Sequence, residues 1–253
     1  MLLECQNVSV QFGGLRALAE FNFQIDPGEL VGLIGPNGAG KTTAFNIVTG
    51  VYAPTQGQIR LGNSRIDGRS PAAINRLGIA RTFQNIRLFQ NLTVMENVLV
   101  ALTHSLKHGL GAALFRTPRF YEQRVLLRRA AAELIDTMGL SGHSRERAGS
   151  LPYGSQRRLE IARALATHPR ILLLDEPAAG MNPREKEELM ALIRDLRDRF
   201  QLGIWIIEHD MKLVMSICQR LIVLDHGETI AVGTPAQVQA DPRVIEAYLG
   251  EPA

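Results

Sequence analysis

Short apolar runs recur along the chain, and polar or small residues follow each of them. Four runs are almost uninterrupted and rich in β-branched side chains, at residues 31–34, 171–174, 204–207 and 221–224. Apolar runs of this length, without alternation, are typical of strands that are covered on both faces of a sheet. We therefore predict that these runs form strands of a mostly parallel sheet.

The segments between these runs have apolar residues at helical spacing. Residues 185–200 place their apolar side chains on one stripe, namely Leu189, Leu192, Ile193, Leu196 and Phe200. Asn182 followed by Pro183 predicts the start of this helix, because Asn is a good N-cap and Pro fits the first turn. Strands that alternate with helices predict an α/β fold.

Residues 1–26 follow a different pattern, in which apolar and polar side chains alternate, as they do from Phe21 to Ile25. Alternation is typical of antiparallel strands with one solvated face. We expect an antiparallel β subdomain at one edge of the fold, joined by residues 58–61 and 229–232.

Residues 85–160 have weak strand signals and a helical pattern, with breaks at residues 109–111 and 117–118. We therefore predict a single domain over residues 1–253. Its α/β core and antiparallel β subdomain occupy residues 1–84 and 161–253, and a helical subdomain is inserted at residues 85–160.

The composition narrows the classes of function. A chain of 253 residues that is 45% hydrophobic can bury a substantial core. No run approaches the about 18 apolar residues of a membrane span, and the N-terminus lacks the pattern of a secretory leader. Cys5 and Cys218 are isolated, which indicates buried, reduced thiols. A net charge of +3 is too weak to favour nucleic acid as a partner.

A glycine-rich segment follows the strand predicted at residues 31–34 and precedes an apolar helix. It fits the phosphate-loop pattern G-x-x-x-x-G-K-S/T and consists of Gly35, Pro36, Asn37, Gly38, Ala39, Gly40, Lys41, Thr42 and Thr43. Glycines let consecutive N–H groups point at phosphate oxygens, and the helix N-terminus adds partial positive charge. We expect ATP here, with Lys41 on the β- and γ-phosphates and the Thr42 hydroxyl on Mg²⁺. A chance glycine-rich turn would not explain the order of strand, loop and helix.

Two acids, Asp175 and Glu176, follow the apolar run at residues 171–174. The carboxyl end of a parallel strand is where such sheets bind ligands. The segment resembles the Walker B element, which implies that Asp175 holds Mg²⁺ through water and that Glu176 acts as the general base that polarises the attacking water. The alternative is a solvated pair of acids at a strand end.

Residues 151–165, LPYGSQRRLEIARAL, resemble the signature motif of the ABC (ATP-binding cassette) ATPases. Pro152, Tyr153 and Ser155 stand where the family usually has Ser, Gly and Gln, whereas Gly154 and the run from Gln156 fit well. The resemblance implies that the signature residues contact the ATP of a partner subunit, and we expect this of Tyr153, Gly154, Ser155 and Gln156. The N–H groups of residues 153–155 and the helix dipole are expected to make the contact. An ordinary amphipathic helix is the alternative.

The resemblance implies roles for further residues. Residues 205–210 resemble the switch histidine segment, which implies that His209 contacts the γ-phosphate and holds Glu176. Residues 81–85 resemble the Q-loop, which implies that Gln84 reaches Mg²⁺ and the attacking water. Phe12 is the candidate for stacking on adenine. A structural histidine and a core phenylalanine are the alternatives for His209 and Phe12.

A narrower resemblance concerns residues 12–18, 82–89, 177–183 and 241–250, together with the LPYG form of the signature. These segments look like the ATP-binding subunits of branched-chain amino acid importers. The resemblance implies a P-loop NTPase (RecA-like) core and hydrolysis of ATP to ADP and phosphate, coupled to transport. Ser155 departs from this branch as well, since a longer polar residue is more usual there.

The resemblance also implies partners and a location. These are a second ABC ATPase subunit (an identical copy or a paralogue), two membrane permease subunits and, indirectly, a periplasmic solute-binding protein. The chain would be cytoplasmic and peripheral on the inner face of the cell membrane. The basic residues 116–129 could lie near anionic headgroups or form a solvated face.

Related ABC systems remain alternatives: amide or urea uptake, lipopolysaccharide export, and soluble ABC proteins of translation or DNA repair. The last class usually carries two cassettes or a long coiled coil. This chain has one phosphate loop, and residues 85–160 contain no heptad run.

Overall fold

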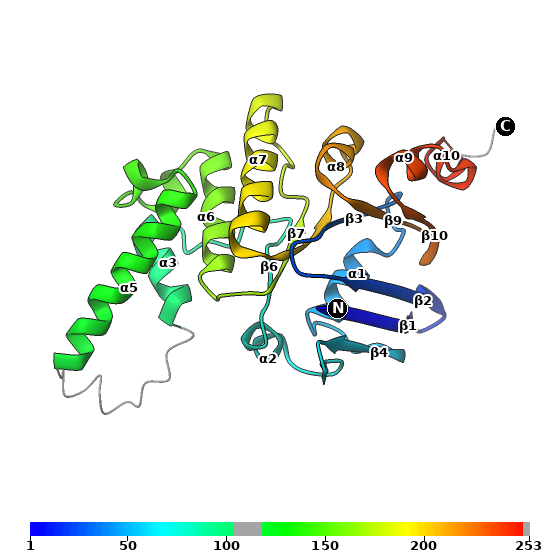
Figure 1. The fold of residues 1–253 in the computed structure, drawn as a ribbon, viewed down its shortest axis with the longest axis horizontal. Helices are drawn as coiled ribbons and strands as arrows, with labels where there is room; N and C mark the ends of the chain where they lie inside the picture. Colours follow the sequence, from blue (N-terminus) through cyan, green and yellow to red (C-terminus); the bar gives the residue numbers. More distant parts are fainter. Residues whose placement is uncertain (104–117, 250–253) are drawn as a thin grey trace. The chain divides into compact units, whose positions relative to one another are not determined.

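A six-stranded sheet, with the strand order β10-β9-β3-β8-β7-β6, forms the centre of the fold (Figure 1). The computed structural model describes residues 1–103 and 118–249. The parallel strands are β3 (Leu30–Ile34), β6 (Ile79–Arg81), β7 (Ile171–Asp175), β8 (Gly203–Ile207) and β9 (Arg220–Asp225). Strand β10 (Glu228–Gly233) runs antiparallel to β9.

The four predicted parallel strands are confirmed, and all residues of β3, β7 and β8 are buried. Burial of whole strands explains why their sequences are apolar without alternation. Strand β6 was not predicted, because three residues are too few to show a period.

A second sheet is antiparallel and has the order β2-β1-β4-β5. It consists of β1 (Leu3–Phe12), β2 (Leu15–Ile25), β4 (Gln56–Leu61) and β5 (Ser64–Arg65). The prediction that residues 58–61 join the first two strands is confirmed, since Cys5 of β1 pairs with both Phe23 and Ile59.

The prediction that residues 229–232 join this antiparallel sheet is wrong. They lie in β10, where Thr229 pairs with Leu224 of β9. The two residues between these strands, His226 and Gly227, have φ angles of 43° and 81°. Two central residues with positive φ make the tight turn of a β-hairpin, so β10 folds back on its neighbour in sequence.

Both sheets belong to a unit that also contains six helices among the residues described. These are α1 (Lys41–Val48), α2 (Pro71–Arg76), α7 (Pro183–Phe200), α8 (Met211–Ile217), α9 (Pro235–Gln239) and α10 (Pro242–Leu249). The predicted N-cap of α7 is confirmed, since Asn182 Oδ1 accepts from the Glu185 N–H at 3.0 Å. Phe200 does not extend the buried stripe, because it ends the helix and is 40% exposed.

An aromatic cluster around Trp205 of β8 links the two sheets to α1. Trp205 is fully buried and stacks on Phe23 of β2 with a ring-centroid distance of 4.0 Å. Phe45 of α1 packs on the same indole at 4.7 Å. Burying side chains of this size stabilises a fold by about 1.5–3 kcal/mol each. The cluster therefore fixes α1, and with it the loop that precedes this helix.

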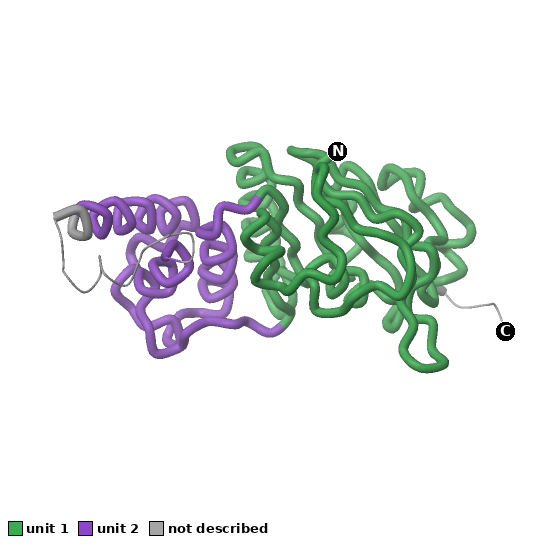
Figure 2. The backbone as a smooth tube through the Cα atoms, turned by 90° about the horizontal axis from the view of Figure 1, so that it is seen from below, with its two compact units in different colours: residues 1–84, 170–253 green, residues 85–169 purple. Residues whose placement is uncertain are grey.

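The chain divides into two compact units, residues 1–84 with 170–253 and residues 85–169 (Figure 2). The second unit contains α3 (Val94–Thr103), α5 (Pro118–Thr137), α6 (Tyr153–Leu165) and the 3-10 turns Ser141–His143 and Ala148–Ser150. The predicted end of the helical segment at residue 160 is wrong, because it falls inside α6. The predicted breaks at residues 109–111 and 117–118 fall on or beside residues 104–117, which lie outside the described residues.

No helix within residues 1–103 and 118–249 is long and apolar enough to span a membrane. Cys5 and Cys218 are both free thiols and both buried, as predicted. Burial raises the pKa of each thiol, so both stay protonated.

Candidate functional site

The predicted phosphate loop connects β3 to α1, as the pattern of strand, loop and helix requires. Gly40, directly before α1, has a φ of 99°, and a Cβ atom there would lie 2.6 Å from the Ala17 carbonyl oxygen. A Cβ at Gly35 would lie 2.0 Å from the Leu224 carbonyl oxygen. Both positions therefore need glycine, because main chain from β2 and β9 comes too close for any side chain.

The turn between β9 and β10 braces this loop through main-chain hydrogen bonds. The Gly227 N–H donates to the Ala39 carbonyl at 3.1 Å, and the Gly227 carbonyl accepts from the Ala19 N–H at 2.8 Å. This contact was not predicted, since no motif marks the turn. It fixes the phosphate loop relative to both sheets.

Lys41 folds over its own loop. Its Nζ donates to the carbonyl oxygens of Gly35 at 2.7 Å and Pro36 at 2.8 Å. Burial lowers the pKa of Lys41, and the charges of Glu176 and Asp175 oppose this shift. The two hydrogen bonds hold the amino group against the loop that precedes α1, and the N-terminus of this helix also favours an anion.

Three of the predicted site residues meet around one carboxylate. Glu176 directly follows β7, and its Oε2 accepts a hydrogen bond from Gln84 Nε2 at 2.9 Å. His209 Nδ1 lies 3.8 Å from the same oxygen, which is close but longer than a hydrogen bond. Gln84 and His209 both follow strands of the same sheet, so the carboxyl ends of neighbouring strands bring these side chains together.

A cavity of about 520 Å³ lies beside the phosphate loop. This volume suits a small-molecule ligand. Among the predicted residues, Phe12, Gln84 and Glu176 line it together with residues 37–43, and Leu15, Arg16, Ala17, His226 and Gly227 complete the wall. Phe12 is 44% exposed and contacts only the edge of Tyr52 among aromatic rings of the described residues, so it is not a core residue.

Asp175 does not line this cavity but forms a buried ion pair. Its Oδ2 lies 2.7 Å from an Arg81 nitrogen, and both side chains are 6% exposed. Arg81 also donates to Asn46 Oδ1 of α1 at 2.7 Å and lies over the rings of Phe45 and Phe83. Arg81 was not predicted as a site residue, although it stands only three positions before Gln84.

The residues present fit both ATP and Mg²⁺. The loop has glycines with positive φ at residues 35, 38 and 40, and its residues 37–43 border the cavity, as in the main-chain cradles that hold phosphates. Thr42, Gln84 and Asp175 offer hydroxyl, amide and carboxylate oxygens, the donors that Mg²⁺ prefers. They belong to α1 and to the ends of β6 and β7, and Asp175 commits one oxygen to Arg81.

The signature residues lie in the second unit, at the start of α6. The helix begins at Tyr153, Pro152 is its N-cap residue, and no side chain caps it. The first main-chain bond runs from the Gln156 N–H to the Pro152 carbonyl at 3.0 Å, so the N–H groups of Tyr153, Gly154 and Ser155 precede the helical ladder. The Gln156 side chain turns back to the Leu151 carbonyl at 2.9 Å.

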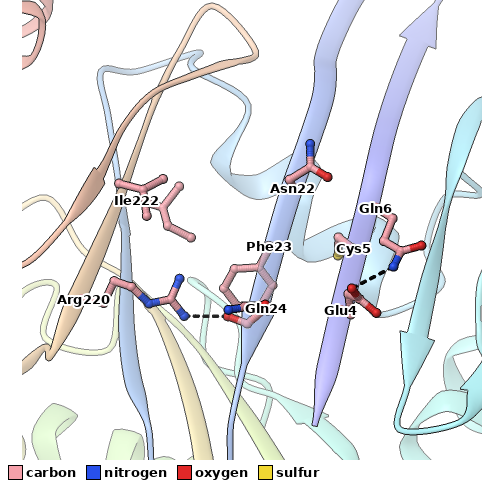
Figure 3. A pocket seen from close by; sticks show the side chains of 9 residues that line it. Glu4, Cys5, Gln6, Asn22, Phe23, Gln24, Arg220 and Ile222 are labelled. Atoms are coloured by element: carbon pink, nitrogen blue, oxygen red, sulfur yellow. Dashed lines mark hydrogen bonds between the residues drawn. The ribbon is translucent and has the colours of Figure 1, made fainter. Parts of the chain in front are cut away.

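A second cavity, of about 270 Å³, lies apart from the phosphate loop, between β1, β2 and β9 (Figure 3). Its polar groups are largely bonded to one another: Gln6 donates to Glu4 at 2.7 Å, and Arg220 donates to the Gln24 carbonyl at 2.7 Å. No sequence motif marks this cavity.

The basic segment at residues 116–129 lies partly on α5. Of its basic residues, Arg124, Arg128 and Arg129 have described side chains, and all three are exposed.

Family models, curated relatives and solved structures match this chain over most of its length. The family model for ABC transporters matches residues 18–179, and the model for branched-chain amino acid ATP-binding cassette transporters matches residues 228–253. The high-affinity branched-chain amino acid transport ATP-binding proteins LivG of Escherichia coli and BraF of Pseudomonas aeruginosa are 49% and 48% identical, each over 99% of this chain and 98% of the relative. The crystal structure of a nucleotide-free ATP-binding cassette from an ABC transporter matches with a TM-score of 0.85 and 30% identity, over 99% of both chains. This chain therefore belongs to the ABC transporter family.

Proposed function

We propose that this chain hydrolyses ATP to ADP and phosphate and thereby drives an importer of branched-chain amino acids. One observation carries the catalytic part of the proposal. Gln84 holds the Glu176 carboxylate at 2.9 Å, and both line the cavity that the phosphate loop walls. A carboxylate held beside a phosphate cradle is suited to receive a proton from an attacking water.

Binding of the nucleotide falls to groups along the cavity. The N–H groups of residue 35 and residues 37–43, together with the N-terminus of α1, bind the phosphates. Lys41 turns its ammonium from its own loop carbonyls to the β- and γ-phosphates. Phe12 stacks on adenine, since its ring is half exposed at the cavity.

The hydrolytic step depends on orientation and charge. Glu176 takes the proton of the attacking water, and Gln84 orients both the Glu176 carboxylate and that water. His209 adds a hydrogen-bond donor toward the γ-phosphate. Mg²⁺, when bound, supplies positive charge to the phosphate oxygens. Thr42, Gln84 and Asp175 would hold it, with Asp175 acting through water.

The site is completed by a second ATPase subunit, identical or a paralogue. The N–H groups of residues 153–155, at the uncapped start of α6 in one subunit, bind the γ-phosphate of the ATP that is held by the phosphate loop of the other subunit. The pair works beneath two membrane permease subunits, fed by a periplasmic binding protein, at the cytoplasmic face of the cell membrane.

The similarity to branched-chain amino acid transport proteins supports the choice of solute, as does the family-model match at residues 228–253. The test is uptake of labelled leucine, isoleucine and valine by cells that lack this chain. We expect uptake to return with the wild-type chain and not with Glu176→Gln. Normal uptake in the deleted cells, with the permease present, would refute the solute assignment.

A further inference from the structure

Glu208, the residue after β8, is a buried carboxyl group that the proposed reaction does not use. It is 2% exposed and precedes His209. Burial raises its pKa, while hydrogen bonds from the Ala178 and His209 N–H groups oppose the shift. A carboxyl group of this kind is costly to bury and remains only where its hydrogen bonds repay the cost.

Its principal bond reaches the turn that carries Glu176. Glu208 Oε1 accepts from the Ala178 N–H at 2.8 Å, two residues beyond Glu176. The preceding residue, Ile207, accepts from the Glu176 N–H at 2.9 Å through its carbonyl. Strands β7 and β8 pair in parallel, so the end of β8 holds the turn after β7 at residues 176 and 178.

The backbone of this turn is strained at Glu176, the proposed base. Glu176 has a φ of 46°, in the left-handed region that disfavours residues with a Cβ. Such a conformation costs about 1–3 kcal/mol and persists only where the surroundings enforce it. Hydrogen bonds at residues 176 and 178 enforce it here, and the resulting backbone directs the Glu176 carboxylate to Gln84.

We propose that Glu208 is a positioning residue for ATP hydrolysis: it holds residues 176–178 so that Glu176 keeps its place beside Gln84 at the cavity. The inference rests on the proposed role of Glu176 as the base. It assigns Glu208 no contact with the nucleotide. Loss of its acceptor oxygen should therefore reduce turnover and leave ATP affinity in place.

The test compares Glu208→Leu, Glu208→Ala and Glu208→Gln in the purified full-length chain. We expect the leucine and alanine variants to lower kcat by about a hundredfold, as misplacement of a catalytic group does. Glu208→Gln keeps an oxygen acceptor for the Ala178 N–H and should recover most of the rate. ATP affinity, measured by filter binding of labelled ATP, should change by less than about threefold, because Glu208 makes no contact with the nucleotide. The alanine variant preserves the comparison if the leucine variant does not fold.

Asp67→Ala is the matched control. Asp67 Oδ1 also accepts a main-chain bond, from the Ile59 N–H at 3.0 Å, but in the antiparallel sheet. We expect this control to lower the melting temperature without lowering kcat. If Glu208 only stabilised the fold, its variants would likewise lower the melting temperature without lowering kcat.

Three outcomes would overturn the inference: wild-type kcat in Glu208→Leu and Glu208→Ala, ATP affinity that falls in step with kcat, or Glu208→Gln no faster than Glu208→Ala. Glu176→Gln separates these from failure of the proposed function, because wild-type turnover there would remove Glu176 as the base. In the double variant Glu176→Gln/Glu208→Leu, single-turnover hydrolysis should be no slower than in Glu176→Gln, since both changes act on one group.

Discussion

Replacing Arg81 with Met should destabilise the unit built from residues 1–84 and 170–253 far more than loss of one surface charge would. Arg81 and Asp175 lie 2.7 Å apart with side chains that are each 6% exposed. Removing one partner of such a pair leaves an unpaired buried charge and costs about 3–5 kcal/mol. Met fills the space of the arginine stem, so the cavity term is small. We therefore expect a loss of about 3–5 kcal/mol in the free energy of unfolding.

Urea unfolding followed by tryptophan fluorescence measures this loss directly. Trp205 is the single tryptophan of the chain, and it packs on Phe45, the ring over which Arg81 lies. Arg184→Met is the control, because Arg184 pairs with Glu188 on α7 at 3.1 Å but its side chain is 89% exposed. Exposed pairs at this helical spacing are worth about 0.3–0.5 kcal/mol.

The second partner provides an internal check. Arg81→Met/Asp175→Leu leaves no unpaired charge, so it should be more stable than Arg81→Met alone. If Arg81→Met loses no more than Arg184→Met, or if the double variant loses more than the two single variants combined, the ion pair is not the desolvated contact that its geometry indicates.

Further predictions concern the loop, the signature and the buried acid. Lys41→Ala should weaken ATP binding at least about tenfold in equilibrium titration, since about 1.4 kcal/mol of charge-assisted bonding is lost; unchanged affinity would contradict the phosphate-loop assignment. Pro152→Ser should change the ATPase rate less than about tenfold, because the N–H groups after residue 152 make the contact, and a larger gain would show that the native signature is impaired. Because burial raises the pKa of Glu208, beside Glu176 and His209, its stabilising contribution is full below the unfolded-state pKa and is lost as pH rises through the raised value. In the wild type, stability in urea should therefore fall as pH rises above 4.5, the ordinary pKa of a glutamate, and Glu208→Gln should lack this part of the fall. An identical dependence on pH in both proteins would contradict the prediction.

The sequence predicted those features that depend on local pattern. Strand, loop and helix around Lys41, the two acids at the end of β7 and the N-cap at Asn182 are each encoded within a short stretch, and each lies where it was expected. The partner of β10 was predicted incorrectly, because apolar alternation identifies a strand but not the strand that it pairs with.

Side chains whose role depends on distant residues were missed. Arg81 meets Asp175 across 94 positions of sequence, and Glu208 meets Ala178 across 30. Both lie in segments that resemble family motifs, residues 81–85 and 205–210, but the resemblance assigns roles there only to Gln84 and His209. Their importance follows from burial and from partners that only the folded chain brings together.

The turn at Gly227 fixes the distance between the Phe12 end and the phosphate-loop end of the cavity. It bonds to Ala39 in the phosphate loop and to Ala19 in β2, the strand that continues from the hairpin of Phe12. These bonds use main-chain atoms, so the span between the aromatic end and the phosphate end of the cavity does not depend on the identity of the intervening side chains. Substitutions at exposed positions of β2 should therefore leave this span unchanged. Gly227 itself is the exception, because a Cβ there would lie 3.0 Å from the Ala17 carbonyl oxygen and its φ is 81°.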